Sequence, residues 1–308
     1  MELSNNDIVE VRTIIHNYFV EKLGEGEPVI FLPAAGFSGK EGLNIAEELS
    51  DRFETHLIDL PGLGKSEGIE QRITPLVLAN WVNEYMEEQH IERATLIGHS
   101  LGGAILLAFA LYYPNKVDKL ILLDQGHKPY PRIPTSEFGP FAYMFPLING
   151  CVRLLGKPFL KRLAPLFMQE NETVEDNIEA SVKQFCERTA IEENEYVKIA
   201  FKNPIDFSVE GLNLMFGYYN LKLPKLLLNV NVPTYLVYGT FENMDDKEYR
   251  RTNKYIQKLK KHNLPVTYFP VKSGHYVHWS NHFELSDLTH ILTANSSENN
   301  DYAEYISN

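Results

Sequence analysis

The chain has 308 residues, of which 44% are apolar and 12% aromatic, so it can bury a large core that needs neither a metal nor a disulfide framework for stability. Its two cysteines, Cys151 and Cys186, are too few for such a framework, and its formal net charge of -12 argues against nucleic acid as a partner. Residues 1–10 lack the features of a secretory signal and no apolar stretch is long enough to cross a membrane, so we expect a cytoplasmic protein without integral membrane association.

Short apolar runs alternate with helical segments along most of the chain. Near-continuous apolar strands separated by helices are typical of a parallel sheet that is covered on both faces. Upstream of these runs, residues 11–20 predict one or two antiparallel strands. The apolar runs lie at residues 29–32, 56–59, 94–97, 120–123, 234–238 and 266–269.

Two of the helices between these runs can be predicted from local signals. Thr74 is a favoured N-cap residue, and it is followed by Pro75 at the expected first helical position, where proline is common. The segment 101–111 is apolar on every side, and this pattern predicts a helix buried within the protein.

The alternation stops between the fifth and the sixth apolar run. Residues 127–228 contain helical segments and proline-rich loops without a clear strand. Structureless loops of this length are rare, so the segment predicts an inserted helical cap. The core then consists of residues 11–126 and 229–294. Residues 295–308, rich in Ser, Asn and acidic side chains, predict a polar and flexible tail.

A G-x-S-x-G pattern at residues 98–102 follows the predicted strand 94–97 directly and opens the buried helix. A strand, this pattern and a helix in succession are the context of a nucleophile elbow. The sharp turn strains the backbone of Ser100 and requires residues without a Cβ two positions before and after it. It also directs the first amides of the helix towards a developing negative charge.

Four segments in the same order resemble the α/β-hydrolase family, in particular its esterases, lipases and C–C hydrolases. They are F-L-P-A-A-G at residues 31–36, where the family has its oxyanion loop, D-L-P-G-L-G-K-S at 59–66, the elbow at 98–102, and S-G-H at 273–275 after the last strand. The resemblance covers residues 11–293. It implies an α/β fold with a mostly parallel eight-stranded sheet, helices on both faces and an inserted helical cap.

Ser100 and His275 are the expected nucleophile and general base. A serine hydroxyl needs a base within hydrogen-bond reach, and an imidazole can take and return the proton near neutral pH. His278 and His282 compete with His275, and the H-x-x-H-x-x-x-H spacing raises the hypothesis of a metal site. No cysteine and no Glu-x-x-His pattern accompanies these histidines, so we expect no metal and no cofactor.

The acid that orients the histidine is open to several assignments. The family commonly places it in a G-x-x-D pattern after the strand that follows the cap, and Glu242 stands at that position. We rank Glu242 first, then Asp246 or Asp245, and last Asp124, which ends its own strand at the place that a minority of the family uses.

The family also implies an oxyanion hole built from backbone amides. Pro33-Ala34 replaces the usual His-Gly of the oxyanion loop. Because the donors are main-chain N–H groups, the shape of the loop matters more than its side chains. The resemblance suggests the amides of Ala35 and Leu101.

The predicted cap combines basic and aromatic residues. One hypothesis is an amphipathic cover with its basic face in water. A second is a roof over an apolar acyl pocket, with a basic rim that makes weak contact with an anionic lipid surface. Candidate pocket residues are His99, Phe141 and Phe145. The basic residues of the segment 127–168 are Lys128, Arg132, Arg153, Lys157, Lys161 and Arg162, opposed by Glu137.

These features together predict a serine hydrolase acting on a small-molecule ester, thioester or lactone with an apolar acyl part through a covalent acyl-enzyme. The same fold also supports C–C hydrolysis and acyl transfer to another acceptor. A hypothesis from a different class is a ligand-binding receptor with little turnover. The sequence does not indicate an oligomeric state.

Overall fold

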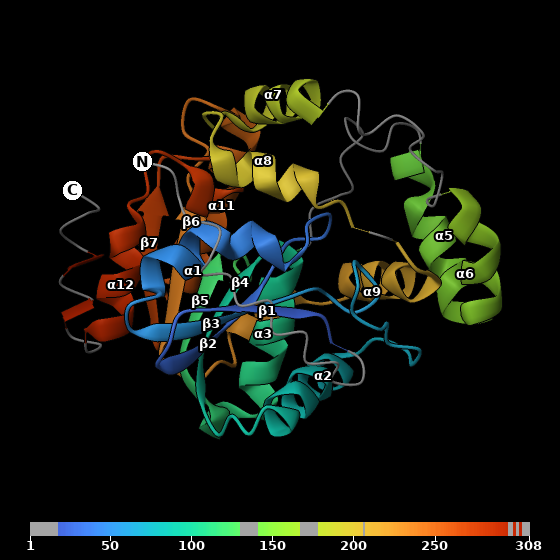
Figure 1. Cartoon of the computed structure of the whole chain (residues 1–308). Coiled ribbons are helices and arrows are strands. Elements are labelled where there is room, and N and C mark those ends of the chain that lie inside the picture. Colours follow the sequence, from blue (N-terminus) through green and yellow to red (C-terminus); the bar gives the residue numbers. More distant parts are fainter. Residues whose placement is uncertain are drawn as a thin grey trace.

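A computed structural model describes residues 18–129, 141–166, 178–205, 207–294, 298–299 and 302–303 of the chain. Its centre is a seven-stranded sheet in the order β1-β3-β2-β4-β5-β6-β7 (Figure 1). Strand β1 is antiparallel to β3, and all other neighbours are parallel. The strands are β1 (Val20–Leu23), β2 (Glu27–Leu32), β3 (Phe53–Ile58), β4 (Ala94–His99), β5 (Val117–Leu123), β6 (Thr234–Gly239) and β7 (Val266–Val271).

All six apolar runs of the sequence form parallel strands, which confirms the predicted α/β-hydrolase fold class. The expected count of eight strands is not met, because the described residues form seven. Upstream of the parallel strands, the described part of the chain contains one antiparallel strand, β1, while residues 11–17 lie outside it.

Helices cover both faces of the sheet. One apolar layer contains residues of α2 (Pro75–Glu88), α3 (Ser100–Tyr112) and α11 (Asp246–Leu259). The opposite layer contains residues of α1 (Leu43–Leu49) and α12 (Leu285–Thr293). Apolar side chains on both faces explain why the strands are apolar without interruption.

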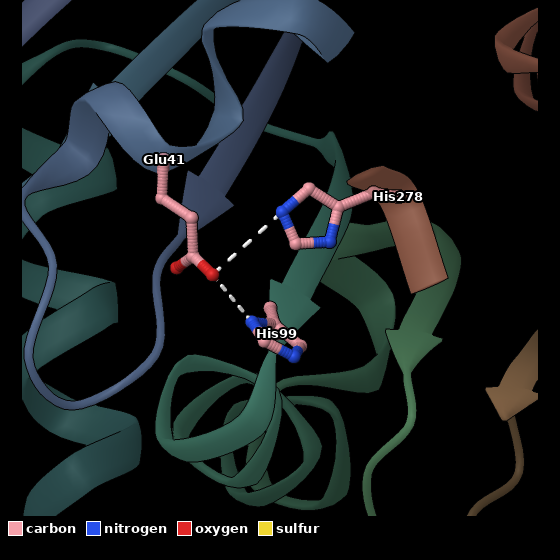
Figure 2. Close-up of side chains that lie close together, drawn as sticks. All are labelled: Glu41, His99 and His278. Atoms are coloured by element: carbon pink, nitrogen blue, oxygen red, sulfur yellow. Dashed lines mark hydrogen bonds and ion pairs between the residues drawn. The ribbon is translucent and has the colours of Figure 1, made fainter. Parts of the chain in front are cut away.

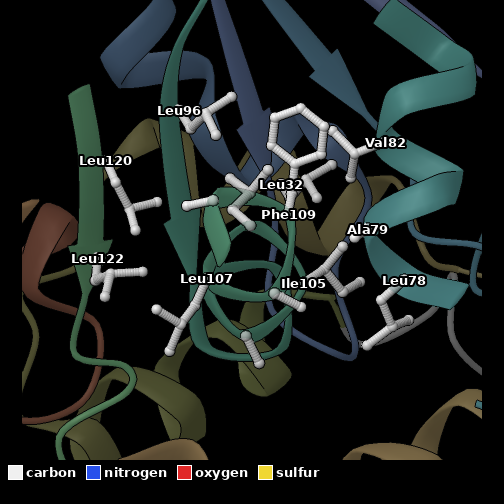
Figure 3. Close-up of a cluster of buried hydrophobic side chains, with 14 of the residues drawn as sticks. Leu32, Leu78, Ala79, Val82, Leu96, Ile105, Leu107, Phe109, Leu120 and Leu122 are labelled. Carbon is white, nitrogen blue, oxygen red and sulfur yellow. The ribbon is translucent and has the colours of Figure 1, made fainter. Parts of the chain in front are cut away.

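Helix α3 lies at the centre of the larger layer (Figure 3). Every residue from 101 to 110 is buried, so the predicted buried helix is confirmed. Its leucines pack against β4, β5 and α2, and truncating one of them to alanine typically costs about 2–5 kcal/mol. Helix α2 begins as predicted, because Thr74 Oγ1 accepts a hydrogen bond from Val77 N–H at 3.2 Å. Helix α3, which carries the elbow, is therefore held in place by its packing against β4, β5 and α2.

The described residues between β5 and β6 form helices and no strand of the sheet. In Figure 1, α7 and α8 lie above the sheet, and α9 lies between the core and the pair α5 and α6 at the right edge. Aromatic and aliphatic side chains of α5, α6 and α9 form one cluster, whereas α7 and α8 pack on Phe37 and Trp279 of the core. The helices are α5 (Phe141–Leu155), α6 (Lys157–Leu163), α7 (Ile178–Thr189), α8 (Glu195–Lys202), α9 (Val209–Tyr219) and α10 (Leu223–Leu227).

Residues 298–299 and 302–303 are the described parts of the segment 295–308, for which a flexible tail was expected, and they contact α12. The Asn299 amide donates to the carbonyls of Ile291 and Ala294 near the end of α12, and Tyr302 Oη donates to Asp287. Unpaired carbonyls at a helix end need donors, so these polar side chains have a structural use that composition alone did not reveal. In the part of the chain that the structure describes, no helix combines the length and apolar character needed to cross a membrane.

Candidate active site

The nucleophile elbow has the geometry that its sequence predicted. Strand β4 ends at His99, α3 begins at Ser100, and Ser100 has a φ of 47°, a left-handed conformation that costs a serine roughly 1–3 kcal/mol. A Cβ on Gly102 would lie 2.2 Å from the carbonyl oxygen of Leu32, and one on Gly98 would lie 2.6 Å from the Cα of Gly103. The surrounding backbone therefore enforces the strained turn.

His275 pairs with Asp124 at the same edge of the sheet. The carboxyl ends of the parallel strands β4, β5 and β7 lead to Ser100, Asp124 and His275 respectively. The His275 Nδ1 atom lies 2.6 Å from Asp124 Oδ2. Asp124 has a φ of 46°, which aspartate tolerates better than most residues, and its Oδ1 accepts from Gly239 N–H at 3.3 Å. The carboxylate is thus fixed from two sides.

Nearby groups keep Asp124 ionised although its side chain is only 1% exposed. Burial raises the pKa of this carboxyl. The Lys128 ammonium at 3.8 Å, the hydrogen bond with His275 and the proximity of His127 act in the opposite direction and lower the pKa to about 2. Asp124 is therefore a permanent hydrogen-bond acceptor at neutral pH.

The two histidines beside Asp124 are held neutral. Burial lowers the pKa of His275, and the charge of Lys128 acts in the same direction, while Asp124 opposes both. Burial also lowers the pKa of His127, to about 3, although its Nε2 lies 3.6 Å from Asp124 Oδ1. A neutral His275 with a proton on Nδ1, donated to Asp124, leaves Nε2 free to act as a base.

The acids that the sequence ranked first do not lie against His275. Glu242 is exposed, in a turn where Phe241 has a φ of 59°. Asp245 caps α11 by accepting from the amides of two following residues, and Asp246 begins that helix and is exposed. The tight turn after β6 sends the chain directly into α11, so these acids lie at a helix start. The geometry does not support the ranking and favours Asp124, whose signal in the sequence is its position directly after a strand.

A second histidine–carboxylate pair lies behind the elbow and was missed in the sequence. Glu41 Oε1 lies 2.6 Å from His99 Nδ1 and 3.6 Å from His278 Nε2, and all three side chains are 0% exposed (Figure 2). Glu41 lies in the turn Gly39–Gly42 after the oxyanion loop, and no sequence pattern marked it. His282 is exposed, so the histidines at 275, 278 and 282 do not form a site together.

The proposed pocket residues differ in their placement. His99 is fully buried and hydrogen-bonded on both ring nitrogens, so it does not line a pocket that substrate can enter. Phe145 is stacked on Phe216 at 4.7 Å within the cluster of α5, α6 and α9. The side chain of Phe141 lies outside the described residues.

The oxyanion loop is bonded to the elbow. Gly102 N–H donates to the Pro33 carbonyl at 2.9 Å, and Ala34 N–H donates to Glu41 Oε2 at 2.5 Å. Each of these engaged amides is adjacent in sequence to one of the expected oxyanion donors, Ala35 and Leu101. The loop path is thereby fixed by one hydrogen bond to the main chain of the elbow and one to the Glu41 side chain, despite the absence of the usual His-Gly.

Part of the basic charge of the predicted cap is neutralised. Lys128 points inward to Asp124 and Glu248, and Lys157 pairs with Glu70 and with Glu210. Arg132 and Glu137 lie outside the described residues. The exposed basic residues that remain are Arg153, Lys161 and Arg162.

Comparisons with known proteins agree with this fold. The family model described as the alpha/beta hydrolase fold matches residues 27–282. A pimeloyl-[acyl-carrier protein] methyl ester esterase of Chromobacterium violaceum is 32% identical over 167 residues, which are 53% of this chain and 62% of that protein. A 2-hydroxy-6-oxo-6-phenylhexa-2,4-dienoate hydrolase of Comamonas testosteroni is 41% identical over 110 residues, 33% of this chain and 38% of that protein. The chain thus spans less than two thirds of the length of these curated relatives.

The solved structure of E-2-(acetamidomethylene)succinate hydrolase superimposes with a TM-score of 0.63, covering 89% of this chain and 94% of that one. At 18% identity this likeness concerns the fold alone. The family match over residues 27–282, on a sheet of this order with a strained serine after β4, shows that the chain belongs to the α/β-hydrolase family.

Proposed function

We propose that this protein is a serine hydrolase with Ser100, His275 and Asp124 as its catalytic residues. Its substrate is an ester, thioester or lactone with an apolar acyl part. The observation that carries the proposal is the 2.6 Å pair of His275 Nδ1 and Asp124 Oδ2, at the sheet edge where the strained Ser100 begins α3. A strained serine, a neutral imidazole and a permanent carboxylate are the parts that acyl transfer to a serine needs.

The reaction proceeds in two halves. Ser100 Oγ attacks the carbonyl carbon while His275 Nε2 takes the hydroxyl proton, and the amides of Ala35 and Leu101 donate to the oxyanion. The intermediate then collapses, the bond to the leaving group breaks, and His275 returns the proton to that group. A water molecule next gives its proton to His275 and attacks the acyl carbon, which releases the acid and restores Ser100. Asp124 stabilises the imidazolium that forms in each half.

The relatives support ester cleavage first and C–C cleavage second. The esterase from Chromobacterium violaceum shares 32% identity over the longer segment, and the hydrolase from Comamonas testosteroni shares 41% over a shorter one. Residues 127–228 act in this proposal as a helical cap over the core formed by residues 11–126 and 229–294. Because α10 packs with α3 in the core layer, its apolar residues attach the C-terminal end of that cap to the core.

The outer face of α5 supports a further proposal of weak contact with an anionic lipid surface. Among the described residues, five of the eight exposed large apolar side chains lie on α5, next to the exposed basic residues Arg153, Lys161 and Arg162. Exposed apolar and basic side chains together favour the boundary of a charged bilayer. Sedimentation with anionic and neutral vesicles tests this: preferential binding to anionic vesicles supports it, and equal, negligible binding excludes it. The five residues are Tyr143, Met144, Leu147, Leu154 and Leu155.

Hydrolysis of p-nitrophenyl esters of increasing acyl length, by wild type and Ser100→Ala, tests the main proposal. We expect turnover by the wild type and a loss of at least about 10³-fold in kcat for the variant, since the triad acts as a unit. The preferred acyl length reports the depth of the pocket. At most one slow event per wild-type molecule would instead indicate a receptor, and equal activity of the variant would exclude Ser100 as the nucleophile.

A further inference from the structure

The buried pair formed by Glu41 and His99 holds a single shared proton. The His99 Nε2 atom lies 3.0 Å from the main-chain oxygen of His275. A carbonyl oxygen only accepts hydrogen bonds, so Nε2 carries a proton. His99 Nδ1 and Glu41 Oε1, 2.6 Å apart, then share one further proton, whichever atom holds it. The pair is neutral as a whole, which is compatible with its complete burial.

The hydrogen bonds of this pair join three segments that carry the proposed reaction. Glu41 Oε2 accepts from Ala34 N–H in the oxyanion loop, and Ala34 precedes Ala35, the proposed oxyanion donor. His99 precedes Ser100 in the elbow. Through Nε2–H, His99 also holds the main chain of His275, and its ring lies 4.6 Å from the ring of His275, centroid to centroid. One carboxylate thus connects the oxyanion loop, the nucleophile and the base.

The distances distinguish this pair from a metal site. Glu41, His99 and His278 bring three potential ligand atoms within 4.8 Å of one another. Two ligands on one tetrahedral ion, each about 2.1 Å from it, lie about 3.4 Å apart. The 2.6 Å between Nδ1 and Oε1 is instead the length of a charge-assisted hydrogen bond. His278 Nε2 lies 3.6 Å from Glu41 Oε1, which is beyond hydrogen-bond length, and neither of its ring nitrogens has a hydrogen-bond partner among the described residues, so His278 packs beside the pair without sharing its proton.

We propose that Glu41 and His99 are positioning residues, which hold the oxyanion loop and the main chain of His275 in register with Ser100 through their shared proton. The inference rests on the proposed hydrolase function. A displacement of reacting groups by about 1 Å can cost about 10²-fold in rate, so fixing these three segments together has a direct catalytic use. The expected signature is a change in kcat with little change in KM, because the pair does not contact the substrate.

Three variants test the role in turnover. Glu41→Leu removes both hydrogen bonds, and we expect kcat to fall by about 10–10²-fold with KM little changed. Glu41→Gln can accept from Ala34 N–H and donate to a neutral His99 Nδ1, so it should recover most of that loss. His278→Leu is the matched control, since the His278 side chain is equally buried but makes no hydrogen bond to the oxyanion loop or to the main chain of His275. Wild-type kcat in Glu41→Leu, no recovery in Glu41→Gln, or an equal loss in His278→Leu would each overturn the proposal.

The proton itself can be observed without any turnover. In ¹H–¹⁵N spectra of the full chain labelled at histidine, we expect one strongly downfield, exchange-protected proton from the His275–Asp124 pair and a second from the His99–Glu41 pair. His56 and Glu54, also 2.6 Å apart, can give a further signal, which neither variant below alters. Asp124→Asn should remove only the first and Glu41→Gln only the second. A wild type that shows the Glu41-dependent proton but hydrolyses no ester would refute the proposed function and leave the shared proton established. The absence of that proton, or a stoichiometric metal ion in the purified protein, would refute the pair.

Discussion

Two histidine–carboxylate pairs lie close together in this molecule, with the same 2.6 Å between nitrogen and oxygen. The side chain of His275 is 37% exposed, whereas those of His99 and Glu41 are 0% exposed. His99 has hydrogen bonds on both ring nitrogens, one to Glu41 and one to the His275 main chain. An imidazole with both nitrogens engaged cannot exchange a proton with substrate, so only His275 is suited to be a base.

The charges around the two carboxylates differ as well. Lys128 lies 3.8 Å from Asp124 and helps to lower the pKa of that acid to about 2, against the effect of burial. Glu41 instead has two buried histidines as its neighbours. The comparison teaches that two chemically similar pairs can be suited to different roles by their surroundings, and on this basis we propose catalysis for His275–Asp124 and positioning for His99–Glu41.

The largest effect should come from Asp124→Asn. The amide cannot stabilise the imidazolium and favours the wrong tautomer of His275, so we expect kcat for ester hydrolysis to fall by about 10⁴-fold. Steady-state kinetics measure the loss, with circular dichroism to verify folding.

Glu242→Gln serves as the matched control for that substitution. Its carboxylate is exposed in the turn after β6, and we expect kcat to stay near the wild-type value. A greater loss in Glu242→Gln than in Asp124→Asn would restore Glu242 as the acid and would break the comparison of the two pairs.

The sequence was sufficient to predict the strands, the buried helix and the elbow, because each follows from a local pattern. Apolar runs gave the six parallel strands, and the glycines flanking Ser100 marked the strained turn. The geometry favours Asp124 over Glu242, the acid ranked first from the sequence, for a physical reason. The position of Glu242 relative to His275 depends on how sharply the chain turns after β6, and a positive φ at Phe241 cannot be read from the residue type.

Glu41 could not be predicted from the sequence for a similar reason. A glutamate in a short glycine-flanked turn is ordinarily exposed, and its burial here depends on β4 bringing His99 beside it. The partners are 58 positions apart in the chain, so no local spacing relates them.

A smaller effect, on stability, should also separate the two pairs. Glu41→Leu leaves Ala34 N–H and His99 Nδ1 without their partner, so we expect the free energy of unfolding to fall by about 2 kcal/mol. Asp124→Asn can accept from Gly239 N–H through its oxygen and donate to His275 Nδ1 through its amide nitrogen, so its loss should be smaller. Urea unfolding of both variants measures the difference. A larger loss in Asp124→Asn would mean that the catalytic pair is also the main structural one.

The smallest effect concerns the pH dependence of the reaction. Activity requires neutral His275, and burial lowers its pKa below the ordinary value of 6.5, so the acid limb of kcat/KM should lie below pH 6.5 in the wild type. Lys128 contributes to this lowering, because its ammonium disfavours a second positive charge on the imidazole.

Lys128→Met removes that charge and should therefore raise the pKa of His275, which moves the acid limb to higher pH. The same change raises the pKa of Asp124, but that acid starts near 2 and stays ionised through the range of the measurement. Lys157→Met is the control, since its ion pairs involve Glu70 and Glu210 and not the triad, and its acid limb should coincide with that of the wild type. An unchanged limb in Lys128→Met would mean that partial burial and the neighbouring His99 lower the pKa of His275 without help from Lys128, and the charge of Lys128 would then not distinguish the two pairs.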